Sequence, residues 1–147
     1  MDHVRYYGGA TYIISSHRSS QWGVTLGSFI NIKSFSGVPK DNGKFAPWTD
    51  GLYVHEYGHY IQSQEWGFRY LTKVGIPSLL SAHKAERDWY YSPYDNLPYI
   101  ISDHSFQWYE MDASKKGLEY FKSRHAMTDT FIKCYLSLHP IVDYRNY

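Results

Sequence analysis

The chain is poor in cysteine: among its 147 residues only Cys134 carries a thiol, which excludes an internal disulfide and a zinc site built from several cysteines. Long apolar runs are also missing. The longest mostly apolar stretch, residues 74–80, is far shorter than the roughly 18 residues that a membrane-spanning helix needs. The residues after Met1 lack the apolar segment of a secretory signal peptide. We therefore expect no membrane span and no signal peptide, while export as part of a larger protein stays open.

An excess of charge of either sign is missing as well. Fifteen Lys and Arg residues face 14 Asp and Glu residues, which leaves a formal net charge of +1. This balance argues against a nucleic-acid binder that relies on a basic face and against a polybasic arm that binds membranes. The length predicts one domain, residues 1–147, and leaves open that this domain is the C-terminal piece of a longer protein.

Aromatic residues and histidines are abundant. Sixteen Tyr, seven Phe and five Trp make up 19% of the chain, which suits the walls of clefts and interfaces, because a Tyr ring is apolar and its hydroxyl is polar. Eight His residues add groups that bind metals and carry protons near neutral pH.

The first forty residues favour β-structure. β-Branched and aromatic residues at 4–7 and 10–14 flank a Gly-Gly turn signal. A longer segment, residues 22–32, alternates in character and predicts a single strand, with Val24, Ile32 and the alternate positions between them on one apolar face. Glycines inside this segment could mark bends or bulges.

From Thr49 the apolar period becomes helical. Thr49 or Asp50 can cap a helix that runs to about residue 64 and ends before Gly67. The rest of the chain is expected to form a helix over 68–82 interrupted near Gly75 and Pro77, a long loop over 83–102, a helix from about 106 to 122 capped by Asp103 or Ser105, and a tail over 128–147 that fits either helix or strand.

Residues 55–59 read His-Glu-Tyr-Gly-His, an H-E-x-x-H motif. On a helix, His55 and His59 lie one turn apart on the same face, close enough to bind one zinc ion through their imidazole nitrogens. Glu56 lies about 100° round the helix, where it can activate water beside the metal. Composition alone predicts roughly 0.015 accidental matches in the chain, which favours a zinc site over two incidental histidines.

An open zinc site needs a third protein ligand. The candidates downstream of the motif are Glu86, Asp88, Asp95, Asp103, His104, Glu110, Asp112 and Glu119. The metzincin pattern is excluded, because it requires Gly and His where this chain has Gln62 and Glu65. In the helix expected over 106–122, Glu110 shares an inward face with apolar or small residues, so its carboxylate needs a cation, and zinc would supply it. His104 is the main rival.

Three segments resemble a family of zincin-like domains found in bacteria, notably Bacteroidetes, many of which stand at the C-termini of large Rhs/YD-repeat proteins. They are residues 51–82, which include H-E-Y-G-H-Y-I-Q-S-Q-E-W-G, residues 23–32, and residues 104–113. The likeness covers roughly residues 22–121, and its last segment corresponds to the block that supplies the glutamate ligand of gluzincins. The resemblance therefore implies the same third ligand, Glu110. The chain departs from the family after Glu110, where Met-Asp-Ala-Ser-Lys stands in place of K-x-A-N-R.

Together these features predict an α+β, zincin-like domain, with a small β-sheet followed by a metal-binding helix and further helices. The expected reaction is hydrolysis of a peptide or protein substrate by a zinc metallopeptidase with one zinc per chain. His55, His59 and Glu110 would hold the metal, and Glu56 would act as general base and then as proton donor. Contacts to the substrate or to the oxyanion are expected from His104, Tyr109, His83 or Tyr91.

Two alternatives stay open. One is a degenerate zincin-like module that keeps the metal and serves as an interaction domain. The other is a toxin-effector peptidase domain of an Rhs-type protein. If the chain is a peptidase, we expect the segment 23–32 to form the edge of the cleft and to pair with an extended substrate.

Overall fold

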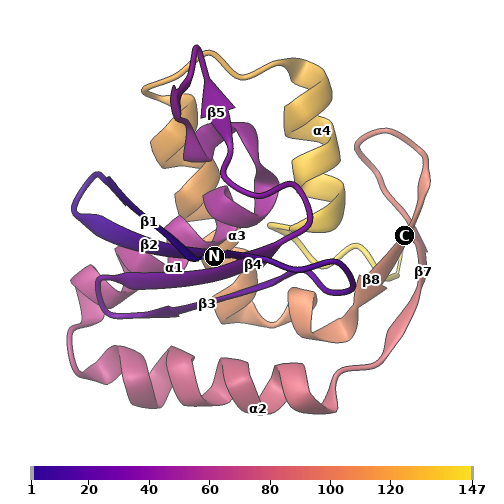
Figure 1. Ribbon diagram of the computed structural model, residues 1–147. Helices are drawn as coiled ribbons and strands as arrows, with labels where there is room; N and C mark the ends of the chain where they lie inside the picture. The colour runs from indigo at the N-terminus through magenta and orange to yellow at the C-terminus, as the bar shows by residue number, and fades with distance from the viewer. Residues whose placement is uncertain (1, 147) are drawn as a thin grey trace.

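A four-stranded sheet forms one layer of the domain in the computed structural model, which describes residues 2–146 (Figure 1). Its strands are β1 (Asp2–Tyr7), β2 (Ala10–Ser16), β3 (Trp22–Leu26) and β4 (Phe29–Ser34), in the spatial order β1-β2-β4-β3. β4 is parallel to β2 and antiparallel to β3. With the helices that follow, this sheet confirms the predicted α+β class, and it leaves β3 at an edge.

The single strand predicted over residues 22–32 is wrong, because the chain turns at Gly27 and Ser28 and makes β3 and β4 a hairpin. Gly27 has a φ of +60°, which a glycine adopts more readily than a residue with a side chain. The turn makes Thr25 and Ile30 cross-strand neighbours, and both are buried. Leu26, which the simple alternation places on the buried face, is 46% exposed.

The motif helix, α1 (Gly51–Trp66), begins and ends where the sequence predicts. Asp50 is its N-cap, and Oδ1 of this residue accepts a hydrogen bond from the backbone N–H of Leu52 at 2.9 Å. The helix ends at Gly67, which has a φ of +54°. Three short elements precede α1: β5 (Lys40–Asp41), β6 (Lys44–Phe45) and the 3-10 turn η1 (Pro47–Thr49).

A second long helix, α3 (Trp108–Lys122), packs directly against α1, and two glycines allow the close approach. A Cβ at Gly58 would lie 1.8 Å from the carbonyl oxygen of Ala113, and one at Gly117 would lie 2.1 Å from that of Val54. Ala113 and Gly117 are buried, so the predicted inward face of this helix is confirmed. The crossing sets the distance between the motif on α1 and Glu110 in the first turn of α3.

α3 starts later than predicted. A 3-10 turn, η3 (Asp103–Phe106), precedes it, and its N-cap Gln107 makes no capping hydrogen bond through the side chain. The proposed caps Asp103 and Ser105 therefore do not act, and the hydroxyl of Ser102 caps the 3-10 turn instead. The ambiguous tail contains a helix, α4 (Asp129–Leu138), which is capped by Thr128.

Residues 69–84 form one helix that contains a π turn, η2 (Leu71–Gly75), ahead of α2 (Ile76–Lys84). The predicted interruption near Gly75 and Pro77 is thus a widened turn and not a break. A π turn accommodates an extra residue, so side chains four positions apart stay on one side of the helix. This side carries two buried residues, Tyr70 and Val74, and then Ser78, which lines a cavity.

A two-stranded hairpin stands where the sequence predicts a long loop over residues 83–102. β7 (Arg87–Tyr91) pairs antiparallel with β8 (Pro98–Ser102). In the connecting turn Asn96 has a φ of +59°, and the carboxylate of Asp95 accepts hydrogen bonds from the backbone N–H of Leu97 and the hydroxyl of Tyr99. β8 begins with Pro98, and a proline argues against a strand when only the sequence is considered. At the first position of a strand, however, its missing N–H is tolerated.

The main core lies between the sheet and the helices and includes Tyr12, Ile14, Ile30, Tyr53 and Phe121. α4 contributes Tyr135 to the same cluster, so the tail belongs to the domain. Among the helices of residues 2–146, none combines the length and the apolar character that crossing a membrane requires.

Candidate metal centre

The packing of α1 on α3 brings together the three side chains that the sequence predicts as ligands. Nε2 of His55 and Nε2 of His59 each lie 3.0 Å from the same carboxylate oxygen, Oε2 of Glu110. All three side chains are largely buried, and Glu110 is 3% exposed. A ligand atom from each lies within 4.8 Å of the others, so the group could hold a metal ion.

Gln62 determines which nitrogen of His59 carries the proton. Its Nε2 donates to the carbonyl oxygen of Tyr109 at 2.9 Å and to Oδ2 of Asp112 at 2.8 Å, so its Oε1 is the atom that faces Nδ1 of His59, at 2.8 Å. An amide oxygen can only accept, so Nδ1 of His59 carries the proton. In the neutral ring, Nε2 then presents a lone pair toward Glu110.

Ser114 determines which nitrogen of His55 carries the proton. Its hydroxyl donates to the backbone carbonyl of Glu110 at 2.9 Å, so its oxygen accepts from Nδ1 of His55 at 3.0 Å. Nε2 of His55 therefore also presents a lone pair to the carboxylate. Two lone pairs and a negative oxygen repel one another unless a cation lies between them. Imidazole nitrogens and a carboxylate oxygen are the donors that zinc accepts in proteins, so the residues present fit a metal.

Without a metal, a proton takes the place of the cation. Burial lowers the pKa of His59, but the charge and the hydrogen bond of Glu110 outweigh burial and raise it to about 9. Burial favours a high pKa for Glu110, yet the charges and hydrogen bonds of the two imidazoles hold it well below its usual range. The metal-free centre is therefore a protonated imidazole paired with a carboxylate.

We expect the metal-free protein to lose stability as the pH rises from about 6.5 to about 9. The pKa of His59 is raised from 6.5 to about 9 on folding, so its contribution is complete below 6.5 and disappears as the pH passes 9. Urea unfolding in the presence of a chelator, repeated across this range, measures the effect. The variant His59→Gln should remove most of the slope, and a wild-type stability that does not change with pH would contradict the assignment.

Glu56 lies beside the centre and outside the ligand set. Its Oε2 accepts a hydrogen bond from Oγ1 of Thr25 on β3 at 2.7 Å. The backbone of β3 approaches the side chain closely, because a Cβ at Gly23 would lie 2.5 Å from Cγ of Glu56. The edge strand thus holds the carboxylate of Glu56 in place at the wall of the cavity.

His104 contacts the other oxygen of the ligand carboxylate. Its Nε2 lies 3.2 Å from Oε1 of Glu110. Burial lowers the pKa of His104, which favours the neutral ring. Nδ1 is buried and has no hydrogen-bond partner among residues 2–146.

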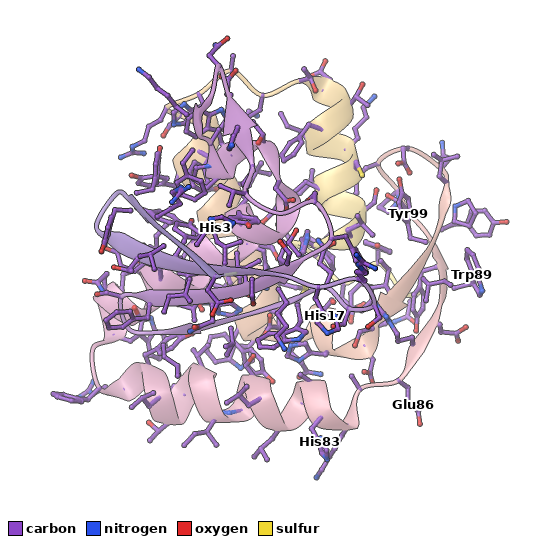
Figure 2. The ribbon with its side chains drawn as sticks, in the orientation of Figure 1. His3, His17, His83, Glu86, Trp89 and Tyr99 are labelled. Atoms are coloured by element: carbon purple, nitrogen blue, oxygen red, sulfur yellow. The ribbon has the colours of Figure 1, made fainter. Side chains whose placement is uncertain are left out.

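The other proposed substrate contacts lie away from the centre. The hydroxyl of Tyr109 donates to the carbonyl oxygen of Pro77 at 3.1 Å, which directs it toward α2. His83 is exposed at the end of α2 and points away from the sheet (Figure 2). Tyr91 on the hairpin is 73% exposed. None of these three side chains lines the cavity over the metal ligands.

A cavity of about 500 Å³ opens over the ligands, between the edge strand β3 on one side and α2 and β8 on the other. Five side chains of the site were not predicted from the sequence: Thr25, Gln62, Ser78, Ser114 and His139. The ring of His139, just after α4, stacks on His55 with 4.9 Å between ring centroids and on Tyr135 at 5.0 Å. Tyr135 and His139 are four residues apart, a spacing that suggests a shared helix face.

Comparisons of the chain with protein-family models, with curated proteins and with solved structures found no match.

Proposed function

We propose that the chain is a zinc-dependent metallopeptidase of the zincin-like type. The observation that carries the proposal is the convergence of two imidazole lone pairs and one carboxylate oxygen on a single point, with Glu56 on the same cavity wall. Three protein ligands from His and Glu suit zinc and leave a coordination position free for chemistry. The resemblance of residues 22–121 to zincin-like domains agrees with this reading.

Zinc held by these side chains would polarise a scissile carbonyl and make water easier to deprotonate. Glu56 supplies the base. Its carboxylate, held at Oε2 by the hydroxyl of Thr25, would take the proton from the attacking water and pass it to the leaving nitrogen. The hydrogen bond from Thr25 also keeps the carboxylate from rotating between these two transfers.

β3 offers a surface along which an extended peptide can lie. It pairs with β4 on one side only, and an edge strand presents unpaired N–H and C=O groups that can bind another strand. The same strand lines the cavity from Trp22 to Leu26 and packs on Glu56 through Gly23. A peptide paired with β3 would therefore pass over the ligands with its backbone near the base.

The test is cleavage of a mixed peptide library by the zinc-loaded wild type and by Glu56→Gln. We expect the variant to hold one zinc per chain and to cleave about 10²–10⁴-fold more slowly, because glutamine keeps the shape of the side chain and removes the base. Mass spectrometry of the library and metal analysis of both proteins give the two readouts.

Two results would contradict parts of the proposal. Loss of zinc from Glu56→Gln would show that Glu56 is a ligand and not the base. Stoichiometric zinc in a wild type that cleaves no peptide would favour the metal-binding interaction module.

A further inference from the structure

α2 reaches the metal centre through Ser78. The hydroxyl of Ser78 donates to Oε1 of Glu110 at 2.6 Å, while Oε2 of the same carboxylate faces both histidines. None of residues 76–84 is buried, so this contact is not a by-product of close packing around the helix. The π turn, Leu71–Gly75, keeps Ser78 on the same side as the buried Tyr70 and Val74, and thus toward the site.

A second polar side chain approaches Oε1. Nε2 of His104 lies 3.2 Å from this oxygen, while the hydrogen bond to it comes from Ser78. The two oxygens of Glu110 are thereby separated into one that receives the hydrogen bond of Ser78 and one that faces the lone pairs of His55 and His59.

We propose that Ser78 is a positioning residue that makes Glu110 a ligand through Oε2 alone. This inference rests on the proposed metal site. A carboxylate that binds zinc through both oxygens takes two coordination positions, and the second is the position that water and substrate need. With Ser78 in place, Oε1 is held back by its hydrogen bond to the hydroxyl and that position stays open. The hydroxyl acts on the coordination of the metal through Glu110.

The experiment compares wild type, Ser78→Ala and Ser78→Thr after substitution of the metal by cobalt(II). The visible absorption of cobalt is strong with four ligands and weakens when a further ligand binds. We expect Ser78→Ala to show weaker cobalt absorption, because Oε1 is released toward the metal. We also expect a loss of zinc affinity of about 10-fold, as for other hydrogen-bond partners of ligands. Ser78→Thr keeps the hydroxyl, so its cobalt absorption and its zinc affinity should match those of the wild type.

Ser81→Ala is the matched control, because it removes the same group from the same helix, and the hydroxyl of Ser81 is near Tyr109 and not Glu110. Circular dichroism of the metal-free proteins verifies that each variant folds. An unchanged cobalt spectrum in Ser78→Ala, or the same change in Ser81→Ala, would overturn the inference. A wild type that binds neither cobalt nor zinc would instead overturn the proposed function.

Discussion

His59→Ala should lower the affinity of the protein for zinc by more than about 100-fold, and His55→Ala should do the same. Loss of a hydrogen-bond partner of a ligand already costs about 10–100-fold, and these variants remove the ligand itself. His59→Ala also leaves Oε1 of Gln62 buried without the N–H that it accepts from, which adds a cost to the folded state. Competition with a chromogenic chelator measures the affinity.

His83→Ala is the control for these variants, because His83 is exposed and lies outside the cavity. It should bind zinc as the wild type does. If the double variant His55→Ala/His59→Ala retained one zinc per chain, the ion would be bound elsewhere and the centre on α1 and α3 would be misassigned.

Gly58→Ala should destabilise the protein by at least about 3 kcal/mol, at the upper end of the cost of overpacking. The new Cβ would lie 1.8 Å from the carbonyl oxygen of Ala113, and a backbone atom in a helix cannot rotate away as a side chain does. α1 and α3 would have to separate. Since His55 and His59 are on one helix and Glu110 is on the other, the variant should lose zinc together with stability. Thermal unfolding and metal analysis of the same samples measure both.

Gly75→Ala is the matched control, since its Cβ would be 3.6 Å from the nearest side-chain atom and its φ of −59° suits any residue. This variant should differ from wild type by less than about 1 kcal/mol, or be slightly more stable. A wild-type melting temperature in Gly58→Ala would show that α1 and α3 are farther apart in solution than in the structure.

The ligands could be predicted because each depends on a local pattern. His55 and His59 follow from a spacing of four residues on one helix, and Glu110 follows from the small and apolar residues that share its face. The structure places these three side chains together. The limits of α1 were predicted for the same reason, since Asp50 and Gly67 are local signals that do not depend on the rest of the fold.

The rest of the site depends on contacts between distant parts of the chain. Thr25 reaches Glu56 only because the segment 22–32 folds back at Gly27, a turn that an alternating apolar pattern conceals. Ser78 and His139 come from segments whose sequences show no chemistry of their own, and they acquire a role when α2 and the segment after α4 pack against the centre. Hydrogen bonds to ligands leave no periodic signal in a sequence.

The π turn makes the length of the helix over residues 69–84 a requirement of the site. Insertion of one further residue between Tyr70 and Ser78 would rotate all later side chains by about 100° and turn Ser78 away from Glu110, because the π turn already accommodates one extra residue. Such a change can fall among exposed residues such as Leu71, Thr72 and Lys73, where a substitution would leave the centre untouched. Single-residue insertions would therefore identify this segment as part of the metal centre, whereas an alanine scan of the same residues would not.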